Sequence, residues 1–419
     1  MIFKIMPGLQ QLTQYKHENL VGDVTAGLIV AFLLLPQSMA YATIAGVPLS
    51  IGLVAATFPL IIYSLFGNSK YLSVGPVSVV SLLAFSGISS IVQPHSSQFM
   101  GLMIVLALLV GVVQIIMGLI RFGSIFDYVS PALISGFTSA IAIIIALNQI
   151  KSIIGVKLPS YHNFFYYLIE IANHIPKANI FSVGIGLGSL FILLVLKKKF
   201  TVSPGPFIVL IASIIIVDYF NLHKKGVDII GEIPQELPSM SMHTTTFDTI
   251  LLLVPIALMI GFISFIESYA IGKTLANKKN EELNPNQELI GLGLANVTSS
   301  FVGAIPVAGA ISRSAVNYQS GAKSNLSLLI TAIFMLLSII YLTPLFYHLP
   351  KAALAAIIII AVSNLINFKN FIIYLKYKST DAAIYLATFI ATLLIDIFIG
   401  LVIGICLSLL VTWIKKKSP

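Results

Sequence analysis

The stretch AGAISRSAVNYQSG, from Ala308 to Gly321, places Arg313 in a chain of 419 residues of which 58% are hydrophobic and 9% are charged. A soluble domain carries about 25% charged residues. Apolar runs of around 20 residues recur along the whole chain, and each is long enough to cross a lipid bilayer. The composition therefore indicates a polytopic α-helical membrane protein. In such a protein an arginine within a membrane segment is costly and is usually kept for a function.

The net charge of +9 indicates membrane topology rather than a nucleic-acid partner. The lysines gather at the ends of apolar segments, as in LKKKF (196–200) and WIKKKSP (413–419), and such clusters mark cytoplasmic loops. We therefore expect both termini in the cytoplasm. The N-terminus is too polar for a cleaved signal peptide. Because the sequence shows no targeting peptide, we expect the protein to lie in a bacterial inner (plasma) membrane.

The apolar segments predict fourteen membrane segments in two sets of seven. Two segments differ from the rest: GPVSVVSLLAFSGI (75–88) and the quoted stretch are short, rich in Gly and Ser, and follow irregular backbone. Each is the third segment of its set. Matching interruptions in two halves are typical of inverted-repeat transporters. We therefore predict an all-α protein with two inverted seven-segment repeats and short broken helices at segments 3 and 10.

This organisation divides the chain into five parts. We expect a cytoplasmic N-terminal segment (1–22), a first repeat (23–225), an extracytoplasmic linker (226–247), a second repeat (248–414) and a cytoplasmic tail (415–419). The two repeats share little sequence identity, so the positions of the broken helices carry the inference.

The two broken helices predict an anion site. Helix N-termini carry unpaired amides and the positive end of the helix dipole, so two N-termini that meet can hold an anion. Arg313 follows the opening of the second helix, and its two-pronged guanidinium suits oxyanions. The hydroxyl of Ser312, and less so that of Ser314, can add to this site. The alternatives are simple kinks, an arginine that reaches the cytoplasmic face, and serines that cap the backbone.

Glu267 is the predicted proton-coupling residue. It lies in the apolar segment IALMIGFISFIESYAIGKTLA (256–276). Desolvation there favours the protonated carboxyl, whereas a nearby Arg313 favours the charged form. A group balanced between these effects can titrate during a transport cycle. The alternative is a structural ion pair with Arg313 or a lysine.

The first segment, IVAFLLLPQSMAYATIAG (29–46), brings further polar groups into the membrane. Pro36 predicts a break in this helix, and Gln37 and Tyr41 lie one turn apart on one face. Gln37 precedes the first broken helix by nearly the same distance as Glu267 precedes the second, so we expect both to face a common cavity. The alternatives are a hydrogen bond between helices for Gln37 and an interfacial position for Tyr41.

The sequence contains no pattern typical of an enzyme. The seven histidines do not have metal-ligand spacing, and neither a Walker motif nor a GxSxG motif is present. We therefore expect neither a catalytic site nor a cofactor or metal site.

Several motifs resemble the SulP (sulfate permease) family. They run in the family's order from about Pro7 to Trp413: VGDVTAGLIVAFLLLPQSMAYATIAGVP, SLFGNSKYLSVGPVSVVSL, YVSPALISGFTSAIAIIIALNQIK, GEIPQELP, IESYAIGKTLA, NQELIGLGLANVTSSFVGAIPVAGAISRSAVNYQSGAK and DIFIGLVIGICLSLL. The resemblance implies a uracil-permease-like fold with core and gate domains, and a homodimer. It also implies an anion held between segments 3 and 10. The substrate positions of the family map onto Gln37, Tyr41, Val77, Ser78, Ser312 and Arg313.

The family's coupling position maps onto Glu267. Proton-coupled members are similar in having glutamate there, whereas a sodium-coupled bicarbonate member has aspartate and a nearby threonine. SRSAVN is similar to the string in plant sulfate–proton symporters. The resemblance therefore implies a secondary active transporter of sulfate or a similar small oxyanion, with H+ rather than Na+ as the coupling ion.

Three alternatives stay open. The cargo can be bicarbonate or a C4-dicarboxylate such as fumarate or succinate. It can be an uncharged nucleobase, or the protein can be a passive anion channel or a non-transporting sensor on the same scaffold. Members of the family usually continue into a cytoplasmic STAS domain. The sequence stops at Pro419, so we expect a membrane domain without it.

Overall fold

The computed structural model describes most of the chain. The described residues are 6–94, 96–124, 129–159, 161, 163–200, 204–233 and 246–417. Residues 234–245 of the predicted linker, residues 1–5 of the predicted N-terminal segment and residues 418 and 419 of the predicted tail lie outside this part. Within it the fold is helical, as predicted, apart from two strands of two residues each.

The chain folds into two compact units, and each draws on both predicted repeats. Unit 1 comprises Met1–Gly123, Thr201–Ile208 and Gly231–Tyr347, whereas unit 2 comprises Ser124–Phe200, Val209–Ile230 and His348–Pro419.

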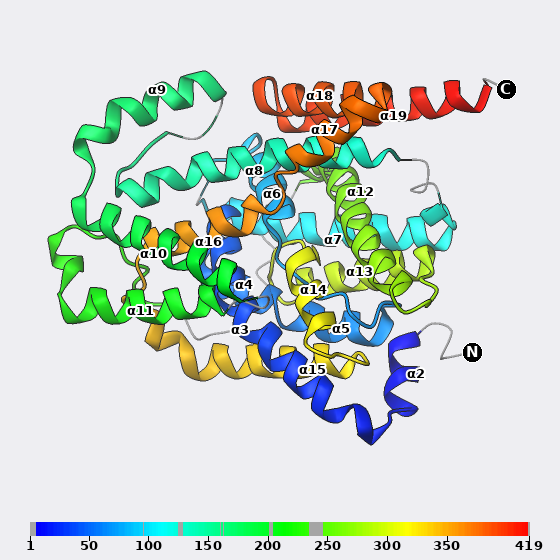
Figure 1. The fold of residues 1–419 in the computed structure, drawn as a ribbon, viewed down its shortest axis with the longest axis horizontal. Coiled ribbons are helices and arrows are strands. Elements are labelled where there is room, and N and C mark those ends of the chain that lie inside the picture. Colours follow the sequence, from blue (N-terminus) through cyan, green and yellow to red (C-terminus); the bar gives the residue numbers. More distant parts are fainter. Residues whose placement is uncertain are drawn as a thin grey trace. The chain divides into compact units, whose positions relative to one another are not determined.

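Unit 1 contains the two strands and both of the short helices that follow them. Its α-helices are labelled in Figure 1. Its elements are α2 (Pro7–Thr13), η1 (His17–Asn19), α3 (Leu20–Ile44), α4 (Leu49–Ala55), α5 (Phe58–Phe66), β1 (Val74–Gly75), α6 (Ser78–Ser89), α7 (Ser97–Leu119), α12 (Phe247–Asn277), α13 (Pro285–Phe301), β2 (Ala308–Gly309), α14 (Ile311–Gln319), α15 (Leu326–Leu337), η5 (Ser338–Leu342) and η6 (Thr343–Phe346).

The regular elements described in unit 2 are all helices, and one isolated β-bridge joins Ile229 to Pro350. Its elements are α8 (Pro131–Ile154), α9 (Phe164–His174), η3 (Ile175–Lys177), α10 (Ile180–Lys199), the larger part of α11 (Gly205–Tyr219), η4 (Leu222–Lys225), α16 (Lys351–Ser363), α17 (Phe368–Tyr377), α18 (Ser379–Leu394) and α19 (Ile397–Lys417).

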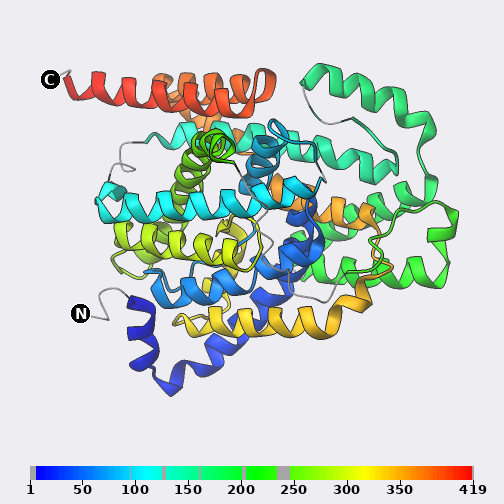
Figure 2. The same ribbon diagram turned by 180° about the vertical axis from the view of Figure 1, so that it is seen from behind.

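Glycines allow α7 and α13 to pack backbone against backbone. A Cβ atom added to Gly111 would lie 2.7 Å from the carbonyl oxygen of Gly293, and one added to Gly293 would lie 2.8 Å from that of Gly111. The two helices lie side by side when seen from either direction (Figures 1 and 2). Small residues at a helix interface are typical of membrane proteins, because they permit close van der Waals contact where water supplies no hydrophobic drive.

The predicted break at Pro36 is wrong. Helix α3 runs without interruption from Leu20 to Ile44, with Pro36 inside it. The proline removes one backbone donor, the one that would bond to the carbonyl of Phe32. A membrane helix tolerates this loss because packed neighbours hold it and satisfy the freed group. Gln37 and Tyr41 therefore lie on one continuous helix.

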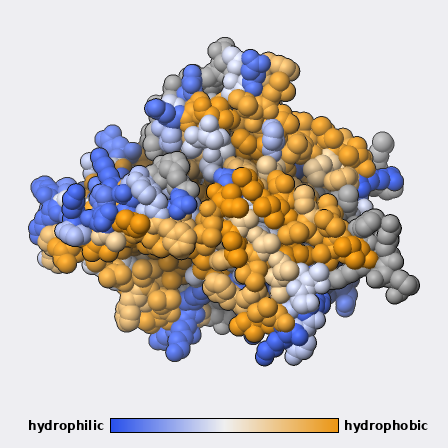
Figure 3. Space-filling model, turned by 90° about the horizontal axis from the view of Figure 1, so that it is seen from above, coloured by the Kyte–Doolittle hydropathy of each residue, from blue (hydrophilic) through white to orange (hydrophobic). Residues whose placement is uncertain are grey.

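Eight helical segments of the described chain are long and apolar enough to cross a membrane, and four shorter apolar helices accompany them. Many of their apolar side chains face outward: Phe191 of α10 is 69% exposed and Ile180 is 74% exposed. Apolar residues also cover much of the face in Figure 3, and hydrophilic residues gather toward its edges. These surfaces suit contact with lipid, so the chain is an integral membrane protein.

Candidate functional site

A short strand pair brings the starts of α6 and α14 together within unit 1. Strands β1 and β2 pair antiparallel, with Val74 opposite Gly309 and Gly75 opposite Ala308. Only Pro76 and Val77 separate β1 from α6, and only Ala310 separates β2 from α14. Helix α6 has 12 residues and α14 has 9, so the prediction of two short helices after interrupted backbone is confirmed.

Neither short helix has a side-chain cap at its N-terminus. The cap positions are occupied by Val77 and Ala310, whose side chains have no acceptor. In contrast, the Phe99 amide at the start of α7 donates to Ser96 Oγ (3.2 Å). The first amides of a helix have no partner inside the helix. Amides of the first turns of α6 and α14 are therefore left for a ligand or water.

Arg313 is completely buried among neutral acceptors. Its Nη1 donates to Gln37 Oε1 (3.3 Å) and to the Pro76 carbonyl (3.1 Å), and its Nε donates to Ser73 Oγ (3.4 Å). Its Nη2 has no hydrogen-bond partner among the described residues. Gly75 leaves room beside it, since a Cβ there would lie 3.3 Å from Nη2. The arginine therefore does not reach solvent, and the Nη2 edge of its guanidinium is left without a hydrogen bond to the described residues.

The other predicted substrate residues lie at the same two helix starts or on α3. Gln37 and Tyr41 are both 6% exposed, and Gln37 Oε1 accepts from Arg313 Nη1. Val77 and Ser78 are buried at the opening of α6. Ser312 is exposed in the first turn of α14. The structure thus brings Gln37 into direct contact with Arg313.

Ser73 is a site residue that the sequence did not single out. Its amide donates to Ser314 Oγ (2.9 Å), its carbonyl accepts from the Ala310 amide (3.0 Å), and its hydroxyl accepts from Arg313. Ser73 thus fixes both the start of α14 and the orientation of the guanidinium. The Ser314 hydroxyl therefore holds the backbone of Ser73. The only signal in the sequence was the position of Ser73 at the start of the irregular stretch SVGP.

Glu267 lies in α12, is 9% exposed, and has no hydrogen-bond partner for its Oε1 in the described chain. Arg313 is directed at Gln37, Pro76 and Ser73, and no ion pair joins Glu267 to a cation among the described residues. The structural ion pair considered above is therefore absent from this conformation. The neighbouring Ser268 Oγ accepts from the Gly309 amide (2.8 Å), which ties this part of α12 to β2.

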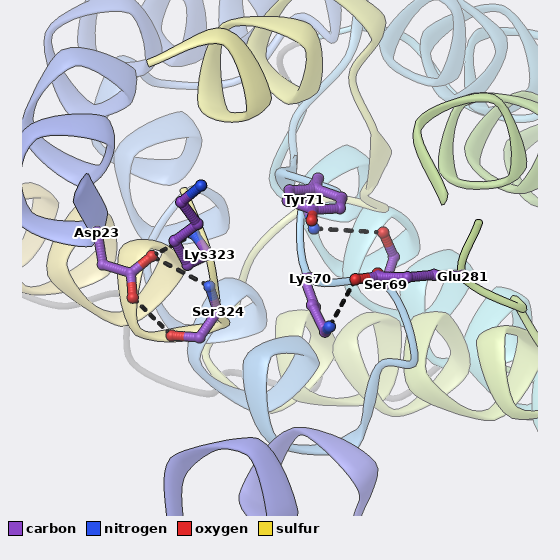
Figure 4. Close-up of polar contacts among 7 residues, drawn as sticks. All are labelled: Asp23, Ser69, Lys70, Tyr71, Glu281, Lys323 and Ser324. Carbon is purple, nitrogen blue, oxygen red and sulfur yellow. Dashed lines mark hydrogen bonds and ion pairs between the residues drawn. The ribbon is translucent and has the colours of Figure 1, made fainter. Parts of the chain in front are cut away.

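A buried carboxylate anchors the far end of α14. Asp23, in the first turn of α3, accepts from the amides of Lys323 (2.7 Å) and Ser324 (3.1 Å) and from the Ser324 hydroxyl (2.7 Å), as Figure 4 shows. The Tyr15 hydroxyl also donates to Asp23 (3.1 Å). Burial, together with the charge of Asp23, raises the pKa of Tyr15 to about 12, so this hydroxyl keeps its proton. The loop after α14 is thus held to the helix that carries Gln37.

The loop before β1 is held by a second set of contacts, also drawn in Figure 4. Lys70 Nζ lies 2.8 Å from Glu281 Oε1, and the Tyr71 amide donates to Ser69 Oγ (3.3 Å). The Tyr71 carbonyl in turn accepts from Asn317 Nδ2 (3.2 Å). Both segments that lead to the candidate site are therefore fixed from more than one side. No group of three or more His, Cys, Asp or Glu among the described residues is arranged to hold a metal ion.

The chain is similar to known proteins along most of its length. Residues 20–388 match the Sulfate permease family. The chain is 37% identical over 393 residues to the probable sulfate transporter 4.2 of Arabidopsis thaliana, a match that covers 92% of this chain and 58% of that relative. It therefore spans less than two thirds of the plant protein's length.

Two solved structures share the fold. With the structure of SLC26A9 the TM-score is 0.93 at 25% sequence identity, and the match covers 100% of this chain and 69% of the other. With the transmembrane domain of a cyanobacterium bicarbonate transporter, BicA, the TM-score is 0.79 at 24% identity, and the match covers 95% and 98% of the two chains.

Fold and site together define a helical integral membrane protein with a buried polar site. Its apolar helices are long enough to cross a bilayer, and buried polar groups lie at two uncapped helix starts. Within that class, the match to residues 20–388 is decisive: the chain belongs to the sulfate permease family.

Proposed function

We propose that this protein is a secondary active transporter of sulfate or a similar small oxyanion, and that it works as a proton symporter by alternating access. The observation that carries the proposal is the environment of Arg313. The guanidinium is fully buried, and its hydrogen bonds go to neutral acceptors. Its Nη2 has no partner among the described residues and lies near two uncapped helix starts. A buried cation without an acidic partner is costly, and an anion would compensate it.

The anion would contact groups that lie at this place. The first amides of α6 and α14, with Val77 and Ser78 at the first opening, would surround it on two sides. Arg313 and Ser312 would bind it from α14, and Gln37 and Tyr41 from α3; all of these residues belong to unit 1. Sulfate fits this set because its four oxygens accept several hydrogen bonds at once, and because the matched family and the plant relative are named for sulfate.

Glu267 would supply the proton coupling. Its carboxyl is buried, lacks an ion pair in the described chain, and lies one residue before Ser268, which anchors β2. Protonation would remove one negative charge from the loaded protein and so lower the cost of moving it through a low-dielectric barrier. Such a role needs H+ and no cofactor.

The wider architecture is part of the proposal. The eight long and four shorter apolar helices, together with α13 and α14, support fourteen segments in two inverted repeats, 23–225 and 248–414. Unit 1 would be the core domain and unit 2 the gate domain. We further propose a homodimer in a bacterial inner membrane with both termini cytoplasmic.

The proposal is tested by uptake of labelled sulfate into proteoliposomes, with and without an inward proton gradient. We expect uphill accumulation only with the gradient. The Glu267→Gln variant should lose this dependence and keep sulfate–sulfate exchange, because its side chain stays neutral. Uptake by the variant that remains fully driven by the gradient would refute the coupling role.

Competition separates the cargoes. Excess unlabelled sulfate should inhibit uptake strongly, whereas succinate, fumarate, bicarbonate and uracil should inhibit weakly. Stronger inhibition by one of these would identify that compound as the substrate in place of sulfate. Currents far above the turnover of a carrier would instead indicate a passive anion channel.

A further inference from the structure

The backbone before β2 is held by a side-chain amide that bonds to both backbone groups of one residue, Val307. Asn296 of α13 accepts from the Val307 amide at Oδ1 (2.8 Å), and its Nδ2 donates to the Val307 carbonyl (3.0 Å). Val307 precedes β2 and lies in irregular backbone. Within a membrane, such backbone needs partners from the protein because water is absent. Asn296 supplies both of them.

A second amide extends this contact to two other helices. Asn296 Nδ2 also donates to Gln114 Oε1 of α7 (3.0 Å). Gln114 Nε2 donates in turn to Ser264 Oγ (2.9 Å) and to the Gly261 carbonyl (3.3 Å), both on α12. The link therefore runs from the segment before β2 through α13 and α7 to α12.

The link closes into a ring through β2 itself. Ser268, one turn after Ser264 on α12, accepts from the Gly309 amide (2.8 Å) and donates to the Ser264 carbonyl. Asn296, Gln114, Ser264 and Ser268 are all fully buried. A continuous, satisfied polar ring of this kind fixes one arrangement of the elements that it joins.

The ring joins the two chain segments that carry Glu267 and Arg313, the groups that the proposed transport needs. Ser264 and Ser268 flank Glu267 on α12, and Gly309 lies four residues before Arg313. A change in the register of β2 against α12 would therefore change the separation of the carboxyl from the guanidinium. Neither the Glu267 carboxyl nor the Arg313 guanidinium belongs to the ring, so the ring affects them only by fixing where they lie.

We propose that Asn296 and Gln114 are positioning residues that keep Glu267 and Arg313 in fixed register, so that proton uptake and anion binding stay coupled. This inference rests on the proposed function. The side chains of Asn296 and Gln114 would contact neither the proton nor the anion.

Gln114→Met is the decisive variant. It removes the hydrogen bonds that link α13 to α12 and leaves few polar groups without a partner. Asn296 Nδ2 keeps the Val307 carbonyl and the Leu292 carbonyl (3.1 Å), and the Ser264 hydroxyl keeps the Gly261 carbonyl (3.2 Å). Asn296→Leu is the stronger variant, since it also removes the partner of the Val307 amide and of the Val307 carbonyl. Thr298→Val is the matched control, because the Thr298 hydroxyl bonds only to the Leu294 carbonyl of its own helix (2.8 Å).

The transport readout is the ratio of proton-driven sulfate accumulation to sulfate–sulfate exchange at equal amounts of folded protein. For Gln114→Met we expect exchange within about twofold of the wild type and a ratio about tenfold lower, the size of effect that one or two buried hydrogen bonds carry. Asn296→Leu should lower the ratio at least as far. A merely structural role would lower exchange and accumulation together and leave the ratio unchanged, which would overturn the proposal.

Hydrogen–deuterium exchange tests the ring without transport. In the wild type the amides of Val307 and Gly309 should exchange slowly, and in Gln114→Met and Asn296→Leu they should exchange about tenfold faster, whereas Thr298→Val should match the wild type. Unchanged exchange in both variants would refute the ring as a clamp. If the wild type shows no proton-driven accumulation, the proposed symport fails. Deuterium exchange then still tests the clamp: faster exchange of the Val307 and Gly309 amides in Gln114→Met than in Thr298→Val would support it, and equal rates would refute it.

Discussion

The surroundings of Arg313 are unusual for a buried cation. An ionised side chain taken out of water costs several kcal/mol unless an opposite charge lies beside it. Here the guanidinium contacts an amide oxygen, a carbonyl and a hydroxyl, and none of these carries a charge. The site is thus poised for an anion, and a fixed negative charge in its place should act as an internal competitor.

Replacement of Gln37 by glutamate would create that competitor. Gln37 Oε1 already accepts from Arg313 Nη1, so a carboxylate there would pair with the guanidinium without new packing. We expect Gln37→Glu to weaken sulfate binding by at least about tenfold, because a charged hydrogen bond contributes about 1.5–3 kcal/mol. Binding is measured by titration calorimetry on purified protein. Gln37→Met, which removes the hydrogen bond and adds no charge, should cost less; equal losses would show that charge at this position does not govern binding.

Two glycines of the strand pair should respond differently to a methyl group. A Cβ at Gly75 would meet Arg313 Nη2 at 3.3 Å, whereas one at Gly309 would meet Leu72 at 2.6 Å. Gly75→Ala should therefore weaken sulfate binding several-fold with little change in thermal stability, because the guanidinium must move by only a few tenths of an ångström. Gly309→Ala should instead lower the melting temperature, because it overpacks a fully buried contact. The reverse pattern would place the free edge of Arg313 away from the ligand.

The helices around the site are held at their ends by buried polar contacts rather than by their own sequences. Helix α14 has only nine residues, too few to be stable by itself. Ser73 and Ala310 fix its start, and Asp23 fixes the loop after it. The short helix therefore depends on α3, the helix that also carries Gln37.

Removal of the Asp23 carboxylate should loosen this anchor in graded steps. Asp23→Ala leaves two amides and two hydroxyls without their acceptor, and we expect a loss of folding stability of about 1–3 kcal/mol. Asp23→Asn should cost less, and Tyr15→Phe, which removes one hydrogen bond, should cost least. Thermal unfolding of the purified protein, followed by intrinsic fluorescence, gives the order. A Tyr15→Phe variant as unstable as Asp23→Ala would contradict the assignment of the anchor to the two backbone amides.

Part of this arrangement could be predicted from the sequence. Gly, Pro and Ser in SVGP and GAIPVAG indicated the two short helices, because such residues favour irregular backbone. The break at Pro36 was wrong, because the packing that keeps α3 continuous is not visible in α3 alone. The roles of Gln114 and Asn296 could not be predicted for a similar reason. An isolated amide in an apolar run has no signature until the chain folds and shows its partner.

The residues of the candidate site all belong to unit 1, although they come from both halves of the chain. They are Gln37, Tyr41, Val77, Ser78, Glu267, Ser312 and Arg313. The sequence suggested two consecutive repeats, and periodicity alone could not show that the compact units interleave segments from each. The grouping matters for charge, because an anion and a proton bound to unit 1 would move with it.

The charge carried per cycle follows from this grouping. Among the described residues assigned to the candidate site, Glu267 is the one carboxyl, so we expect one proton to accompany each sulfate. Each cycle would then carry one net negative charge. A membrane potential acts on such a charge by about 2.3 kcal/mol per 100 mV, which corresponds to about fiftyfold in the accumulation ratio. In proteoliposomes with a potassium gradient and valinomycin, an inside-positive potential should raise proton-driven uptake and an inside-negative potential should lower it. Sulfate–sulfate exchange is the control, because it moves no net charge and should not respond. Uptake that is indifferent to the potential would require two protons per sulfate, and Glu267 alone could not then account for the coupling.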